Sequence, residues 1–91
     1  MELLVRKEYG ERPYVAVLAP RESARLVSPS QRWISRRGEI LRYELGDGLY
    51  EIAASWFAYN GRVRRRDCIW LLISGGKAEE LSSAEVLARL A

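Results

Sequence analysis

Six residues around one short turn have the side chains best suited to chemistry in this sequence. Two aromatic residues precede the Asn60-Gly61 pair and four arginines follow it: Phe57, Tyr59, Arg62, Arg64, Arg65 and Arg66. Arginine presents a planar fork of donors that fits phosphate and also stacks on bases. A base stacked on an aromatic ring gains roughly 1 to 3 kcal/mol. Together these residue types favour contact with RNA or DNA.

The Asn60-Gly61 pair also predicts how these side chains are arranged. It is the preferred sequence for a two-residue type I′ turn, so residues 49–73 are expected to form one long β-hairpin. In that register Tyr59 lies opposite Arg62 and Phe57 opposite Arg64, and opposed residues share a face. We therefore expect both rings to lie exposed near the tip, on one face with Arg62, Arg64 and Arg66.

The other face of this hairpin has the apolar pattern of a core. Ile52 and Ile69 oppose each other there, and the register adds Asp67, which needs an ion-pair partner such as an arginine if it is buried. Arg65 falls on the same face beside Trp56, where it can stack on the indole ring.

A second basic tip is predicted at Arg36-Arg37-Gly38, between strands at 33–35 and 39–45. Gly38 can supply the positive φ that a three-residue hairpin loop requires. If both tips lie at the same end of the molecule, they form one basic patch whose binding weakens steeply with salt. Trp33 provides a second candidate ring for stacking.

Two other interpretations of the arginine-rich tip remain open. The arginine stems can simply cover the aromatic rings and keep a hairpin end soluble. Alternatively, the tip can insert into a larger protein or ribonucleoprotein assembly, because arginine and aromatic residues also dominate interface hot spots.

The composition gives no support to an enzyme. The chain has no His, which removes His-dependent triads, most zinc sites and the usual general base near neutral pH. Cys68 is the only cysteine and is expected to be a small packed residue. No pair of carboxylates is marked out by its spacing. We therefore expect no catalytic residues, no cofactor and no metal.

The bulk properties indicate one small folded domain over residues 1–91. The chain is 48% hydrophobic and 30% charged, far from the composition of disordered proteins. A lone cysteine excludes an intramolecular disulfide, and the first eight residues hold only three consecutive apolar residues, so we expect a cytoplasmic protein without a signal peptide or membrane span. Thirteen arginines among fifteen cationic residues also fit a GC-rich genome or a heat-adapted surface.

The remaining segments predict further strands and a helix. Residues 3–5 and 14–18 are expected to form two strands joined by a turn, and 24–27 a brief strand. Ser82 and Glu85 have the spacing of a capping box, which predicts a helix over about 83–90 with Val86, Leu87 and Leu90 on its apolar side. Glu79 and Glu80 are expected to precede this helix, where they favour its positive end or simply solvate the segment.

These elements predict a mainly β (α+β) fold with a short C-terminal helix. The closely spaced turns favour a small barrel of SH3-like or OB-like type, or a bent antiparallel sheet of hairpins. The leading hypothesis is an accessory module that binds RNA or DNA through phosphate contacts and stacking. The alternative is a non-catalytic subunit that docks into a larger complex, or onto itself, through the C-terminal helix or a sheet edge.

Overall fold

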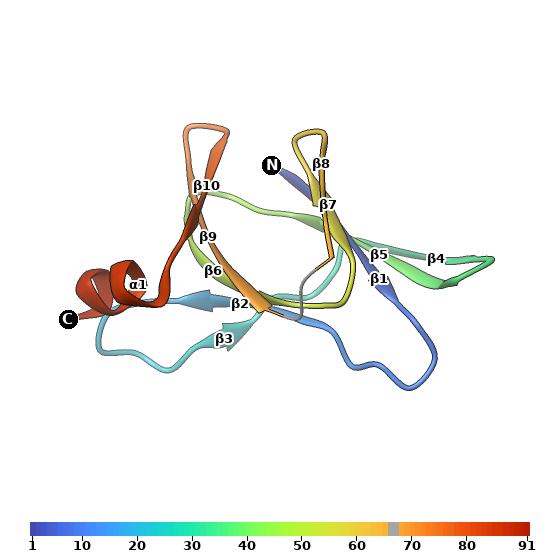
Figure 1. Ribbon diagram of the computed structural model, residues 1–91, viewed down its shortest axis with the longest axis horizontal. Coiled ribbons are helices and arrows are strands. Elements are labelled where there is room, and N and C mark those ends of the chain that lie inside the picture. Colours follow the sequence, from blue (N-terminus) through green and yellow to red (C-terminus); the bar gives the residue numbers. More distant parts are fainter. Residues whose placement is uncertain (66–67) are drawn as a thin grey trace.

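The computed structural model describes residues 1–65 and 68–91, which form two five-stranded antiparallel sheets and a C-terminal helix (Figure 1). Sheet A has the strand order β4-β5-β1-β7-β8, and sheet B has the order β10-β9-β6-β2-β3. The bounds are β1 Glu2–Lys7, β2 Tyr14–Leu18, β3 Arg25–Leu26, β4 Gln31–Ser35, β5 Gly38–Glu44, β6 Gly48–Ala53, β7 Phe57–Tyr59, β8 Arg62–Arg64, β9 Cys68–Ser74, β10 Lys77–Leu81 and α1 Ser83–Leu90. The predicted mainly β fold of hairpins with a short C-terminal helix is confirmed.

The main core lies between the two sheets and draws side chains from both. Its fully buried members are Leu3, Val5, Val15, Ile52, Phe57 and Leu71. Strands of both sheets alternate buried and partly buried positions, as strands with one face on the core do. Each sheet therefore has an inner face on the core and an outer face that other elements or solvent cover.

The long hairpin around Asn60-Gly61 belongs to both sheets. Its base, β6 with β9, lies in sheet B, and its tip, β7 with β8, lies in sheet A. The predicted register is confirmed in both parts, with Ile52 opposite Ile69 and Phe57 opposite Arg64. Asn60 and Gly61 have φ of 44° and 74°, as a type I′ turn requires.

The face prediction is correct at the base of this hairpin and wrong at its tip. Ile52 and Ala54 are buried, and the next buried positions are Phe57 and Tyr59, three and five residues after Ala54. The alternation therefore shifts by one residue where the chain crosses from sheet B to sheet A. Beyond that bend, the face expected to be exposed is the inner face.

The first two strands do not form the expected hairpin. β1 pairs with β5 and β7 in sheet A, whereas β2 pairs with β6 and β3 in sheet B, so the segment between them crosses from one sheet to the other. The predicted brief strand is confirmed as β3. The β4–β5 hairpin is also confirmed, but Ser35 pairs with Gly38 and leaves a two-residue loop at Arg36-Arg37.

Strand β10 was not predicted. Gly75 and Gly76 have φ of 57° and 76° and turn the chain back, so that Lys77–Leu81 pairs with β9. Glu79 and Glu80 therefore lie in a strand. The three charged residues of β10 conceal the strand pattern in the sequence.

Helix α1 is confirmed over Ser83–Leu90 with the predicted capping box between Ser82 and Glu85. These hydrogen bonds lower the pKa of the Glu85 carboxyl below its ordinary value. Val86 is buried in a second apolar cluster on the outer face of sheet B, where Leu90 packs beside it, but Leu87 stays 70% exposed. The described residues contain no helix of the length and apolarity needed to cross a membrane.

Candidate nucleic-acid interface

The two aromatic rings at the hairpin tip are core residues. Phe57 is 0% exposed and Tyr59 is 4% exposed, and their rings lie nearly parallel with centroids 6.2 Å apart. The prediction that these rings are exposed for stacking is wrong, because the shift in alternation at the bend turns them toward the core. Neither ring offers a face to a base.

Arg64 shares this inner face and is held by a carboxylate of the opposite sheet. Its Nε lies 2.8 Å from Oε1 of Glu80 on β10, and the Tyr59 hydroxyl donates a 2.6 Å hydrogen bond to the same oxygen. Arg62 is exposed at the tip, and Arg65 is exposed where β8 ends. The predicted sites at Arg66 and Asp67 lie outside the described residues. Arg64 thus has a structural partner, whereas Arg62 and Arg65 are open to solvent.

Two further predictions around this hairpin are wrong. The cation over Trp56 is Arg6 of β1, whose guanidinium carbon lies 4.5 Å from the ring centroid, and not Arg65. Arg6 is brought there because its backbone N–H donates to the Trp56 carbonyl. Cys68 is exposed rather than packed, although partial burial and Glu51 raise the pKa of its thiol, which disfavours the reactive thiolate.

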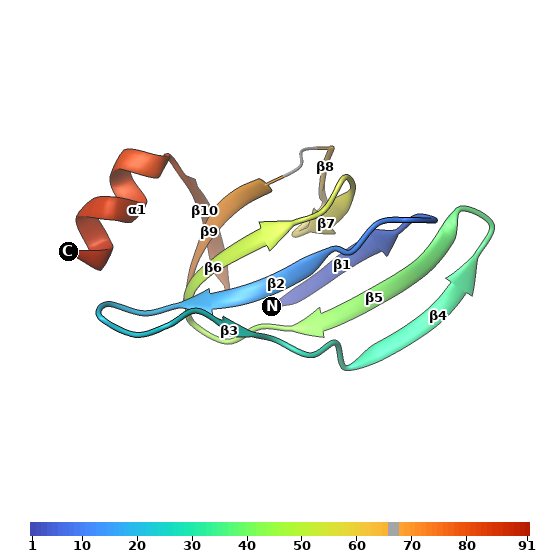
Figure 2. The same cartoon turned by 90° about the horizontal axis from the view of Figure 1, so that it is seen from below.

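The two basic tips lie at opposite ends of β1. The β7–β8 turn follows Tyr59, and Tyr59 pairs with Leu3 near the start of β1. The β4–β5 loop precedes Glu39, and Glu39 pairs with Lys7 at the end of β1. Figure 2 shows the β4–β5 tip well separated from the β7–β8 turn. Arg36 and Arg37 therefore do not form one patch with Arg62.

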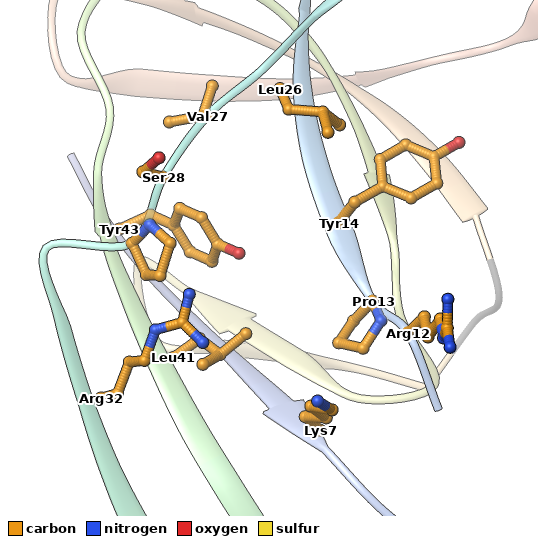
Figure 3. A pocket seen from close by; sticks show the side chains of 11 residues that line it. Lys7, Arg12, Pro13, Tyr14, Leu26, Val27, Ser28, Arg32, Leu41 and Tyr43 are labelled. Carbon is orange, nitrogen blue, oxygen red and sulfur yellow. The ribbon is translucent and has the colours of Figure 1, made fainter. Parts of the chain in front are cut away.

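A groove between the open edges of the two sheets is the strongest candidate site. Its volume is about 470 Å³. In Figure 3, Arg32 and Tyr43 lie on the sheet A side of the groove, and Pro13 and Tyr14 lie on the sheet B side. Lys7 lies between the two sides. The other lining residues are Arg12, Leu26, Val27, Ser28, Pro29 and Leu41. Three cations from three segments thus line this groove.

The positions of these cations follow from the fold. Lys7 ends β1 and Arg32 lies on β4, while Arg12 belongs to the segment that crosses between the sheets. This segment is anchored because the Ser55 hydroxyl donates to Glu11 at 2.8 and 2.9 Å. Arg32 lies 3.7 Å from Glu39, but its side chain is 60% exposed, so this ion pair is weak.

The floor of the groove holds a polar atom in apolar surroundings. Tyr43 is only 2% exposed, yet its side chain lines the groove and its hydroxyl points into it (Figure 3). Burial raises the pKa of Tyr43, with nearby Arg32 acting in the opposite direction, so the hydroxyl stays protonated at neutral pH. It can therefore donate a hydrogen bond to a group that enters the groove.

A second hollow of about 560 Å³ continues this groove, since Lys7 and Arg12 line both. It adds the inner side of the β4–β5 hairpin and two exposed apolar side chains, Tyr9 at 105% and Ile34 at 78%. The two hollows together form a channel with cations at its centre and a tyrosine along each half, Tyr9 in one and Tyr14 in the other.

Positive charge predominates at this end of sheet A. Among the described residues, the cations here are Arg6, Lys7, Arg12, Arg32, Arg36, Arg37 and Arg65, and the carboxylates are Glu8, Glu11 and Glu39. Two of these carboxylates are paired, Glu8 with Arg6 at 3.5 Å and Glu39 with Arg32. The channel therefore lies in a region of excess positive charge, which attracts anions.

Sequence reasoning missed the groove because its cations are distant in the chain and none belongs to a motif. Lys7 and Arg12 fall between residues 5 and 14, where a turn between two strands was predicted. Arg32 precedes Trp33 and has no other basic residue directly beside it. The one available signal was Trp33, the second candidate ring for stacking. It follows Arg32 on β4 and is 45% exposed.

The described residues contain no group of three or more His, Cys, Asp or Glu side chains placed to hold a metal ion. The side chains that line the channel offer cations, hydroxyls and aromatic rings. Neither a family model nor a curated protein nor a solved structure matches this chain, so the channel itself is the basis for assigning a function.

Proposed function

We propose that this protein is a small module that binds single-stranded RNA or DNA in the channel between its sheets. The observation that supports the proposal is the convergence of Lys7, Arg12 and Arg32 on one groove with exposed tyrosines. A positively charged groove with aromatic side chains along it is the arrangement by which proteins hold single strands without reading their sequence.

Each part of the channel has a role in this proposal. The three cations contact successive phosphates, and the Tyr43 hydroxyl donates a hydrogen bond to a phosphate oxygen at the floor. Tyr9 and Tyr14 offer ring faces to unstacked bases. The groove volume of about 470 Å³ lies in the range of roughly 300 to 1,000 Å³ that small-ligand sites have, which suits one or two nucleotides at a time.

The shape of the site favours a single strand over a duplex. The floor residue Tyr43 is 2% exposed, so contact with its hydroxyl requires a group that enters the groove. A duplex is a convex rod whose bases are already stacked, and it would touch only the rim. A single strand can turn its bases toward the rings and its phosphates toward the cations.

Titration by fluorescence anisotropy tests the proposal. Labelled single strands and duplexes of RNA and DNA are titrated with the wild type and with Lys7→Ala/Arg12→Ala/Arg32→Ala at about 50 and 200 mM salt. The three phosphate contacts of the groove cations alone predict that this salt change weakens wild-type binding of a single strand by at least roughly twentyfold. The triple variant is expected to lose most of its affinity and most of its salt dependence.

A charge-matched variant separates the channel from general positive charge. Arg21→Ala/Lys77→Ala/Arg89→Ala also removes three exposed cations, all outside the channel. It should bind single strands within about twofold of the wild type, as expected for sites without phosphate contacts. Equal losses in both variants, or no binding by the wild type at 50 mM salt, would refute the proposal.

A further inference from the structure

The edges of the two sheets differ in how they are protected. Edge strands expose unpaired backbone N–H and C=O groups, and proteins guard them by short length and charged side chains. Of the edges among the described residues, β3 is only two residues long, and β8 is three residues long with Arg62 and Arg64 at its ends. Edge strand β10 carries Lys77, Glu79 and Glu80. These three edges are poor templates for another strand.

Edge strand β4 lacks this protection. It is five residues long, contains no proline and carries one charge, Arg32. Trp33 is 45% exposed and Ile34 is 78% exposed. Figure 2 shows β4 along the free margin of the molecule, with no segment beside it on its outer side. An edge with these properties accepts an added strand through its main-chain groups.

We propose that β4 pairs antiparallel with β4 of a second copy of this chain, around a two-fold axis at Trp33. The two copies of sheet A then form one continuous sheet. Trp33 lies opposite Trp33 of the second copy, Arg32 opposite Ile34, and Gln31 opposite Ser35. Because the contact is the same on both copies, the assembly closes as a dimer.

The side chains of β4 favour this register over its neighbours. A shift that keeps each face on its side of the sheet moves the pairing by two residues. In one direction Arg32 would then oppose Arg32 of the second copy, and in the other it would oppose Arg36. Like charges directly opposite destabilise a strand pair. The register centred on Trp33 has no such pair.

The same register joins apolar side chains on the outer face of the sheet. Trp33 pairs with Ile40 within its own hairpin, so the dimer would carry an unbroken apolar row of Ile40, Trp33, Trp33 and Ile40. Arg32 alternates with Trp33 and lies on the inner side of the sheet, where it lines the groove. The inference does not depend on the proposed function.

Sedimentation equilibrium of the full chain without nucleic acid tests the dimer. The wild type is expected to show a concentration-dependent equilibrium between monomer and dimer. Trp33→Lys and Trp33→Glu should each raise the dissociation constant at least roughly tenfold, since like charges then meet at the axis. A mixture of the two variants should regain the dimer, because Lys then opposes Glu. Val63→Lys, at a position 53% exposed on edge strand β8, is the control and should leave the dissociation constant unchanged.

A cross-link tests the register independently of the charge variants. Opposed residues in an antiparallel pair have Cβ atoms about 4.5 to 5.5 Å apart, near enough for a disulfide after a small adjustment. Trp33→Cys/Cys68→Ser should form a disulfide dimer under mild oxidation, and Val63→Cys/Cys68→Ser should not. A wild type that stays monomeric at every concentration, or a dimer insensitive to Trp33→Lys, would overturn the inference. Failure of both mutant chains to associate when mixed would exclude the register.

Discussion

Gly38 shows how strongly one residue can determine the position of a hairpin. Its φ is 126°, and a Cβ added there would lie 2.2 Å from the backbone oxygen of Lys7. Gly61 also has a positive φ, 74°, but an added Cβ would meet nothing within 4 Å. The two positions therefore separate the cost of an unusual backbone angle from the cost of a collision with another strand.

We expect Gly38→Ala to destabilise the protein by more than about 3 kcal/mol and Gly61→Ala by about 1 kcal/mol. The second value is the ordinary cost of a left-handed conformation for a residue with a side chain. The first is larger because backbone atoms of β1 would have to move, which would also displace Lys7. Urea unfolding monitored by tryptophan fluorescence gives both values. Equal effects at the two positions would contradict the close approach of Gly38 to β1.

Because of Tyr14, the free energy of unfolding is expected to fall at alkaline pH. Its hydroxyl donates a hydrogen bond to Glu51, and this bond, with burial, raises the pKa of Tyr14 to about 12 from an ordinary value of 10.0. The protonated form is thus favoured in the folded state. Its contribution is complete below about pH 10 and is lost as the pH rises toward 12.

We therefore expect the urea midpoint of the wild type to fall between about pH 9.5 and pH 11.5, and the midpoint of Tyr14→Phe to fall less over the same interval. Some decline must remain in the variant, because burial also raises the pKa values of Tyr43, Tyr50 and Tyr59. Parallel midpoint curves for the two proteins would show that the hydrogen bond from Tyr14 to Glu51 has no effect on stability.

The long hairpin shows what could be predicted of an element and what could not. Asn60-Gly61 fixes the register through local backbone geometry, and that register holds where β6 pairs with β9 and where β7 pairs with β8. The burial of Phe57 and Tyr59 depends instead on the crossing from sheet B to sheet A, which no local pattern marks. The turn therefore predicted which residues are opposed, but not which face is buried beyond the bend.

Strand β10 was missed for a related reason. Its carboxylate Glu80 is placed by tertiary contacts, since it accepts from Tyr59 and pairs with Arg64 across the gap between the sheets. In the sequence, Glu79 and Glu80 appear only as charges ahead of a helix. A charged residue that serves as a bridge between sheets cannot be told from a solvated one without the fold.

A double-mutant cycle measures this bridge. We expect a coupling energy of about 1 kcal/mol between Arg64→Met and Glu80→Gln, because both side chains are less than a third exposed, 29% and 24%. The control cycle is Arg6→Met with Glu8→Gln, a pair 3.5 Å apart in which Glu8 is 48% exposed, and its coupling should be close to zero. Coupling of similar size in both cycles would show that the contact between β8 and β10 is an ordinary surface ion pair.

At the scale of the whole molecule, the fold separates residues that the sequence places together and joins residues that it places apart. Arg36 and Arg62 resemble each other as hairpin-tip arginines, but they lie at opposite ends of β1. Lys7 and Arg32 are far apart in the sequence but line one groove. Candidate binding residues could thus be predicted by type, while their grouping required the strand order.

This grouping predicts unequal roles for the two basic tips in nucleic-acid binding. Arg36→Ala/Arg37→Ala removes two cations at the end of sheet A where the channel opens, and should make the slope of log affinity against log salt shallower by about 1.4 for a single strand. Arg62→Ala/Lys77→Ala removes the same charge from the tips of β7–β8 and β9–β10 and should leave the slope unchanged. Salt titrations at one strand length compare the two variants with the wild type. If the second pair changed the slope more than the first, the strand would follow the hairpin tip suggested by sequence alone, and the channel would not be the binding surface.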